Sequence, residues 1–270
     1  MQHSIKVIAV TGPTATGKTR LAVALAEMLD GEIVSVDSRQ VYRGMDLGTG
    51  KDLADYGDTP YHLIDIADPM EEYNLYYFLR DAAAAVQDIA SRGKLPILCG
   101  GTALYLAAFL QKYDQVGDFQ LPFQADTLTL GVYFPRETVR ARIARRMDDR
   151  FEEGMIDEVR RLREKGVTWE RLESFGLEYR EIARHLQGKT SREEMRTLLL
   201  NSIRQFAKRQ DIFFRKMERE GVAIHWIPEG DPEKAVSLCR DFLADKQIPA
   251  PEFQMCNIHY PRCGQKKQTK

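Results

Sequence analysis

A phosphate-binding pattern lies near the start of the chain, in the residues Gly12, Pro13, Thr14, Ala15, Thr16, Gly17, Lys18 and Thr19. They match G-x-x-x-x-G-K-[ST], the P-loop, in which backbone N–H groups and a helix N-terminus bind phosphate oxygens. Lys18 would contact the outer phosphates of a diphosphate or triphosphate, and the Thr19 hydroxyl would bind Mg²⁺. The alternative is a glycine-rich turn with an incidental lysine, but an apolar strand pattern before the loop and a helical pattern after it favour the P-loop.

A second group of polar residues follows the next apolar segment, in residues 37–51. Asp37 stands at the end of an expected parallel strand beside the P-loop, where sheets of this kind bind their ligands. A carboxylate there could bind Mg²⁺ through water or accept a proton from a nucleophile. A turn or a helix cap is the structural alternative for an aspartate at this point.

The pattern of apolar segments predicts the scaffold for both groups. Strand-like runs occur at residues 4–10, 32–36, 62–66, 95–99 and 127–134. Helical spacing occurs between them, at residues 19–29, 75–91 and 102–111. This alternation predicts an α/β fold, a P-loop NTPase-like parallel sheet flanked by helices, with a C-terminal helical block whose patterns lie at 136–165, 168–186 and 191–220.

The expected organisation has four parts. Residues 1–135 form the P-loop α/β core, and residues 136–222 form a basic helical block packed on that core. Residues 223–246 return to the core as a closing strand and helix. Residues 247–270 contain three prolines and end in a lysine-rich stretch, and we expect them to form a flexible tail.

Composition and charge exclude several classes of protein. Hydrophobic residues make up 43% and charged residues 29% of the 270 residues, which is typical of a globular protein. We find neither an apolar run of the roughly 20 residues that a membrane helix needs nor a secretory leader, and we expect a cytoplasmic protein without membrane contact. The net charge of −1 excludes a protein that binds nucleic acid by bulk charge alone.

The charge is unevenly distributed along the chain. Residues 136–219 hold 22 Lys and Arg against 16 Asp and Glu, whereas the rest of the chain holds 17 against 24. A polyanion would dock on this positive block, although a solvated arginine-rich helix face would have the same composition.

In its motifs the chain resembles the tRNA dimethylallyltransferase family, whose members prenylate adenine. The similar segments follow in the family's order: the P-loop with its Pro-Thr-Ala start, Asp37 to Lys51, His62 to Ile66 with Asp68-Pro69, Gly100-Gly101-Thr102 with Tyr105-Leu106, and Ala207-Lys208-Arg209-Gln210. The resemblance covers most of residues 5–227.

The resemblance implies transfer of a dimethylallyl group from dimethylallyl diphosphate to the exocyclic amine (N6) of the adenosine 3′ to the anticodon in tRNA. Diphosphate is released, and Lys18, Mg²⁺ and the loop amides would stabilise its growing charge. Asp37 would act as the general base for the amine. Thr102 would donate a hydrogen bond to a phosphate oxygen or to the amine, and Arg209 would be a further diphosphate contact.

The resemblance also implies how the acceptor is held. The target base is flipped out of its stack in this family, and Ser38, Arg39 and Gln40 would read or hold it beside Asp37. The basic block would contact the backbone of the tRNA anticodon stem-loop. We expect the protein to act as a monomer.

The chain departs from the family pattern at three places. Members carry a helical subdomain of several dozen residues that grips the anticodon stem, where this sequence has only the loop from 112 to 126. Glu178 stands where the family has a glycine, and Ile212-Phe213 replaces Thr-Trp. A free adenine nucleotide (AMP, ADP or ATP), as used by cytokinin-forming relatives, is therefore an alternative acceptor. A more remote alternative is a different function, that of a P-loop small-molecule kinase.

Overall fold

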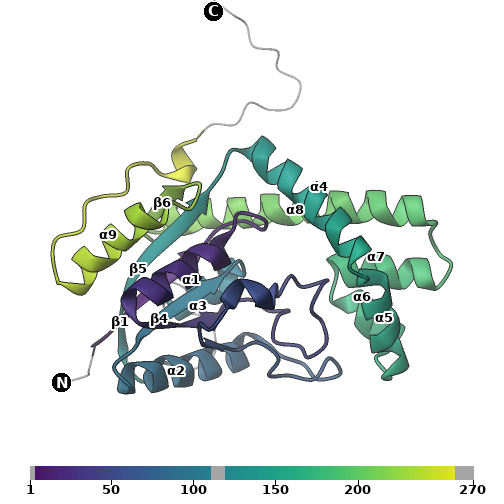
Figure 1. The fold of residues 1–270 in the computed structure, drawn as a ribbon, viewed down its shortest axis with the longest axis horizontal. Coiled ribbons are helices and arrows are strands. Elements are labelled where there is room, and N and C mark those ends of the chain that lie inside the picture. The colour runs from purple at the N-terminus through teal and green to yellow at the C-terminus, as the bar shows by residue number, and fades with distance from the viewer. Residues whose placement is uncertain (1–3, 111–118, 259–270) are drawn as a thin grey trace, which may run out of the picture.

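The computed structural model describes residues 4–110 and 119–258, and its core is a parallel sheet with strand order β3-β2-β4-β1-β5-β6 (Figure 1). The strands are β1 Ser4–Thr11, β2 Gly31–Ser35, β3 Tyr61–His62, β4 Leu95–Gly100, β5 Gln124–Tyr133 and β6 Ile224–Pro228. The helices are α1 Lys18–Leu29, α2 Leu75–Ser91, α3 Ala103–Phe109, α4 Arg136–Glu152, α5 Met155–Glu164, α6 Trp169–Ser174, α7 Leu177–Leu186, α8 Arg192–Arg219 and α9 Pro232–Leu243, with short 3₁₀ turns η1 Leu53–Tyr56 and η2 Met255–Asn257. The predicted α/β fold with a C-terminal helical block is confirmed.

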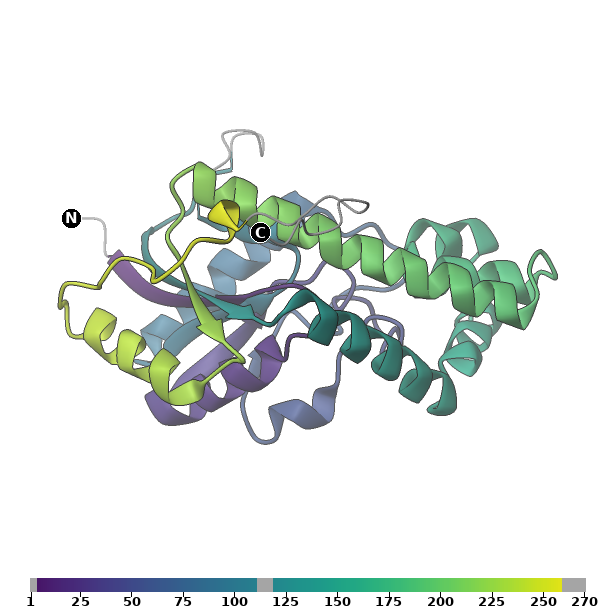
Figure 2. The ribbon, with the colours of Figure 1, turned by 90° about the horizontal axis from the view of Figure 1, so that it is seen from above.

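Helices cover both faces of the sheet, which explains why its central strands are buried and mostly apolar. Every residue of β2 and β4 is buried. Ile8 and Val10 of β1 belong to the core under α1 and α9, whereas Val7 and Ala9 belong to the core under α2 and α3 (Figure 2). Successive residues of a strand point to opposite faces, so each strand contributes to both cores.

The strand register brings three loops to one edge of the sheet. Val10 of β1 pairs with Cys99 of β4, and Cys99 also pairs with Ser35 of β2. The segments that follow these strands are the P-loop, Asp37 and the Gly100-Gly101-Thr102 turn. They therefore lie side by side at the carboxyl edge of the sheet, where parallel sheets bind ligands.

Glycines divide two of the predicted long helices. The pattern at 136–165 forms α4 and α5, with a break at Gly154, whose φ is 96°. The pattern at 168–186 forms α6 and α7, with a break at Gly176, whose φ is 69°. A left-handed φ cannot continue a right-handed helix, so each glycine turns the chain and folds the helical block back on itself.

Helix α8 joins the helical block to the sheet (Figures 1 and 2). Met195 and Leu199 in its first half lie in the core of the block, whereas Phe214 and Met217 in its second half lie in the core beneath the sheet. Its start is fixed by a capping box between Ser191 and Glu194. One 28-residue helix thus passes over the edge of the sheet that carries the P-loop.

The buried carboxylate of Glu158 ties the block to the loop after β2. It accepts backbone amides from Asp46 at 2.9 Å and from Leu47 at 2.7 Å, together with the hydroxyl of Tyr179 at 2.7 Å. These bonds satisfy the carboxylate of a residue that is 2% exposed. The loop that follows Asp37 is consequently held against the helical block.

The segment before residue 259 packs on the body of the protein. Met255 is buried, and the Glu218 carboxylate accepts the amides of Met255 at 3.0 Å and Cys256 at 2.7 Å. A buried carboxylate on α8 thus binds the backbone at Met255 and Cys256. The flexible tail from residue 247 as a whole stays a prediction. Residues 259–270 of that prediction and residues 112–118 of the predicted loop lie outside the described residues. The loop prediction is wrong for residues 124–126, which form the start of β5. Among the helices that are described, none has the length and apolarity needed to span a membrane.

Candidate active site

The P-loop forms a tight turn between β1 and α1, as the sequence predicts. Gly17 has a φ of 80° and is the N-cap of α1, a left-handed conformation that favours glycine. The Thr16 hydroxyl donates to the Pro13 carbonyl at 2.9 Å, and the amide of Thr14 donates to Oε1 of Gln210 at 2.8 Å. The loop is thus fixed from within and from α8.

A phosphate pocket of about 80 Å³ lies against this loop. Its lining includes Lys18 and Thr19 of the P-loop, Asp37 from the end of β2, Asp52, and Arg146 of α4. Burial lowers the pKa of the Lys18 ammonium, and the nearby positive charge of Arg146 lowers it further. An anion bound beside these cations would favour their charged forms, so the pocket is suited to phosphate oxygens.

A larger acceptor groove of about 560 Å³ adjoins the phosphate pocket. Both are lined by Asp37, Arg39, Phe206 and Gln210. The groove also carries aromatic rings and further guanidinium groups, from Tyr42, Tyr73, Phe175, Phe213, Arg171, Arg180 and Arg209. Rings and guanidinium planes of this kind stack on unpaired nucleic-acid bases.

Asp37 lies on the border between the two spaces. Its Oδ1 accepts the backbone amides of Arg39 at 2.9 Å and Gln40 at 3.3 Å. In the described part of the chain, these are the hydrogen bonds of its carboxylate, so Oδ2 is available to accept a proton. Asp37 thus caps a turn, as its structural alternative predicts, and one of its oxygens is also positioned for chemistry.

The turn after β4 places Thr102 beside Asp37. Oγ1 of Thr102 accepts a hydrogen bond from the backbone amide of Ser38 at 3.1 Å. The hydroxyl of Thr102 can therefore donate its proton to a ligand in the groove. A side chain at the preceding Gly101 would put its Cβ 2.5 Å from Nε2 of Gln210 and 3.4 Å from Nζ of Lys18. A glycine there lets the lysine and the glutamine approach the turn closely.

Arg39 and Gln40 occupy different positions. Nη1 of Arg39 donates to Oε2 of Glu178 at 2.8 Å. Burial lowers the pKa of this guanidinium, but the carboxylates of Glu178 and Asp37 outweigh that effect and raise it. The glutamate that stands in place of the family's glycine therefore anchors Arg39 between the groove and the pocket.

The amide of Gln40 is engaged on the phosphate side. Its Nε2 donates to the Gly50 carbonyl at 3.0 Å, and its Oε1 accepts the Ser35 hydroxyl at 3.1 Å. Gln40 lines the phosphate pocket, whereas the lining of the acceptor groove includes Ser38 and Arg39 but not Gln40. A contact of Gln40 with a base stays a prediction, and this geometry does not favour it.

The late helical motif contributes two neighbouring residues with different contacts. Arg209 lines the acceptor groove, with its guanidinium carbon 5.9 Å from the centroid of the Phe206 ring. Gln210 is 5% exposed, and besides accepting the Thr14 amide it donates to the Gly101 carbonyl at 2.8 Å. Gln210 therefore connects α8 to both the P-loop and the glycine turn, while Arg209 faces the groove.

Sequence reasoning missed several residues of the site. Phe206 and Phe213 share one side of α8 with Arg209 and Gln210, and their spacing of three and four residues is the signal that could have found them. No local signal marks Asp52 or Arg146, because they reach the P-loop only through the packing of α4 against the loop after β2.

Comparison with known proteins identifies the family. An IPP transferase model matches residues 40–125 and 118–217, and an isopentenyl transferase model matches residues 5–58. The chain belongs to the IPP transferase family. Its relatives include tRNA dimethylallyltransferase 2 of Pelobacter propionicus, 42% identical over 83% of this chain and 90% of that one. Another is tRNA dimethylallyltransferase 1 of Geotalea uraniireducens, 40% identical over 86% and 95% of the two chains.

Solved structures share the fold of this IPP transferase. The tRNA isopentenylpyrophosphate transferase of Bacillus halodurans superposes with a TM-score of 0.77 at 29% identity, covering 88% of this chain and 95% of that one. A eukaryotic dimethylallyltransferase acting on tRNA reaches the same TM-score at 22% identity, which supports the fold.

The comparisons also show that this IPP transferase is shorter than a relative within the aligned region. The family model matches in two pieces that overlap at residues 118–125, which belong to the predicted loop of residues 112–126. The aligned region with the Pelobacter relative is 281 residues long, more than the 83% of 270 residues that this chain contributes. The relative therefore has internal residues that this chain lacks.

Proposed function

We propose that this IPP transferase is a tRNA dimethylallyltransferase. It transfers the dimethylallyl group of dimethylallyl diphosphate to N6 of the adenosine 3′ to the anticodon in tRNA and releases diphosphate. The observation that carries the proposal is the junction of a P-loop pocket with an aromatic and arginine-lined groove at Asp37. In this proposal the first space holds the diphosphate and the second holds the flipped base. The names of the relatives at about 40% identity support the same reaction.

The donor side of the site stabilises a leaving diphosphate. Negative charge grows on the diphosphate as its bond to the allylic carbon breaks, and the loop amides and Lys18 stabilise that charge. Thr19 lines the same pocket, and its hydroxyl would bind Mg²⁺, which keeps waters and binds substrate phosphates. When bound, Mg²⁺ would neutralise charge on the diphosphate. The described residues contain no cluster of three acidic, His or Cys groups that could hold a metal.

The acceptor side positions a weak nucleophile. The N6 lone pair forms the new bond to the allylic carbon while the carbon–oxygen bond of the donor breaks. The proton that N6 then loses passes to Oδ2 of Asp37, whose Oδ1 is held by the turn. Thr102 donates its hydroxyl to a phosphate oxygen or to the amine, because Ser38 occupies its acceptor side.

The flipped adenine would stack within the acceptor groove, and the polynucleotide would extend over the helical block. Arg204 and Lys208 are exposed on α8, and no carboxylate in the described ranges pairs with either. They are suited to phosphate oxygens of an RNA backbone. The proposal includes action as a monomer in the cytoplasm, the compartment that we expect from the sequence.

Label transfer tests the proposal. Purified protein is incubated with radiolabelled dimethylallyl diphosphate, Mg²⁺ and one of three acceptors. These are unmodified tRNA with an adenosine 3′ to the anticodon, the same tRNA with guanosine at that position, and AMP with ATP. We expect label in the first tRNA alone. Label only in the mononucleotides would establish the adenylate alternative, and ATP hydrolysis or phosphoryl transfer without labelling would indicate a kinase.

A further inference from the structure

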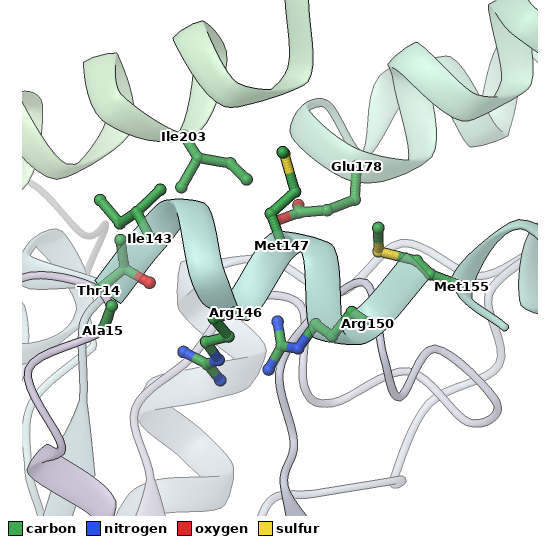
Figure 3. Close-up of a pocket in the computed structure, with 9 residues that line it drawn as sticks. All are labelled: Thr14, Ala15, Ile143, Arg146, Met147, Arg150, Met155, Glu178 and Ile203. Carbon is green, nitrogen blue, oxygen red and sulfur yellow. The ribbon is translucent and has the colours of Figure 1, made fainter. Parts of the chain in front are cut away.

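Two guanidinium groups extend from α4 toward the loop after β2. Figure 3 shows Arg146 and Arg150 on the same side of the helix, opposite the side on which Ile143 and Met147 face Ile203. The side chain of Arg146 is 33% exposed, whereas that of Arg150 is 9% exposed. Arg146 and Arg150 thus lie on one face of α4, but the side chain of Arg146 is the more exposed of the two.

The open space beside Arg146 is the phosphate pocket. Among the described residues, those that line the phosphate pocket include Arg146 but not Arg150. Nη2 of Arg146 donates to Oδ2 of Asp52 at 2.5 Å and lies 3.3 Å from the Gly50 carbonyl. Nη2 of Arg150 binds the other oxygen of Asp52 at 2.9 Å. One carboxylate therefore anchors both guanidinium groups and holds Arg146 at the wall of the pocket.

The phosphate pocket is lined by three cations, Lys18, Arg39 and Arg146, and by three carboxylates, Asp37, Asp52 and Asp55. Lys18 and Arg146 are two like charges that an anion between them would stabilise. Burial lowers the pKa of Arg146, and the nearby Arg150 charge adds to this effect against the opposing pull of Asp52. Lys18 is similarly affected by Arg146. Two cations that repel each other across a small pocket gain most from a ligand that carries several negative oxygens between them.

We propose that Arg146 is a second cationic ligand of the donor diphosphate, which it binds together with Lys18 through the N–H groups that its contacts with Asp52 and Gly50 leave over. The inference rests on the proposed function, since that function supplies a diphosphate donor. A guanidinium held by Asp52 is already oriented, and its Nε and Nη1 groups are left to donate to phosphate oxygens. Asp52 is in this view a positioning residue for Arg146.

The test uses the full chain and titrates inorganic diphosphate with Mg²⁺ by calorimetry, alongside label transfer to tRNA. R146Q should weaken diphosphate binding by roughly ten- to a hundredfold and lower turnover by at least about tenfold, since it removes a charged contact to the leaving group. R150Q is the matched control, because it breaks an ion pair to the same Asp52 and should leave diphosphate affinity within about threefold. R146K keeps the charge without the guanidinium that Asp52 orients and should bind at least about fivefold more weakly than wild type.

Each outcome discriminates. Wild-type diphosphate affinity in R146Q or in R146K overturns the inference, and so does an equal loss in R150Q, which would assign the effect to the loop around Asp52. Thermal melting of each variant identifies a folding defect, and R146K decides the matter where R146Q does not fold. A wild-type protein that neither binds diphosphate nor labels tRNA would refute the proposed function itself. Wild-type activity with unaffected Arg146 variants would refute this inference alone.

Discussion

Substitution of Asp37 separates its structural role from its chemical one. Asp37→Asn retains a carbonyl oxygen that can accept the amides of Arg39 and Gln40, but it cannot take a proton from an amine. Loss of a general base lowers turnover by roughly 10²–10⁴-fold, which is about 3–5 kcal/mol of transition-state stabilisation. Asp37→Ala also loses both hydrogen bonds, at about 0.5–1.5 kcal/mol each. We therefore expect similar turnover in the two variants, with a stability loss of about 1–3 kcal/mol in the alanine variant alone.

Single-turnover label transfer and denaturant melts measure the two roles independently. The donor KM should stay within about threefold of wild type in Asp37→Asn, since an interaction made in the transition state lowers kcat rather than binding. Turnover in Asp37→Asn within about threefold of wild type would remove Asp37 from the base role and leave it as a turn residue. Equal stability loss in both variants would show that the asparagine does not preserve the turn.

Three further predictions concern Phe206 in the acceptor groove, Gln210 on α8 and Glu32 in β2. Phe206→Ala should weaken tRNA binding about tenfold, because stacking on a base contributes about 1–3 kcal/mol, and an unchanged affinity by filter binding would exclude that contact. Gln210→Ala leaves the Thr14 amide and the Gly101 carbonyl without their hydrogen-bond partner, so it should cost about 1–3 kcal/mol of stability and raise the donor KM. Denaturant melts and steady-state kinetics that match wild type would contradict this prediction. Hydrogen bonding to Arg92 lowers the pKa of Glu32 from 4.5 to about 2. The folded state then binds fewer protons than the unfolded state between these values, so the stabilisation is complete above about pH 4.5 and is lost toward pH 2. Glu32→Gln should be about 1–3 kcal/mol less stable than wild type at pH 7, with a gap that closes across this window in urea melts; a constant gap would refute the linkage.

The parts of the site that the sequence predicts are those defined by local spacing. The P-loop needs a strand, a turn and a helix that are contiguous, so the spacing of residues 12–19 is enough to place Gly17 at the turn and Lys18 at the start of α1. The alternation of strands and helices determines that the loops after β1, β2 and β4 share an edge, which brings Asp37 and Thr102 together.

The parts that the sequence does not predict depend on packing between distant segments. Arg146 reaches the pocket only because α4 ends just before Gly154 and packs beside the 50–52 loop. Gln210, rather than Arg209, contacts the P-loop, and the choice depends on the rotation of α8 about its axis. The backbone amides of Met255 and Cys256 donate to the carboxylate of Glu218, a partner that is remote in sequence.

The central claim is that prenyl transfer takes place at Asp37, where the phosphate pocket and the acceptor groove meet. A crystal structure with an unreactive thio-analogue of dimethylallyl diphosphate, Mg²⁺ and an anticodon stem-loop tests it most directly. We predict the diphosphate against the P-loop amides and Lys18, with N6 of the flipped adenine about 2.6–3.2 Å from the Asp37 carboxylate. A diphosphate bound away from Lys18, or an adenine amine that cannot reach Asp37, would contradict the account.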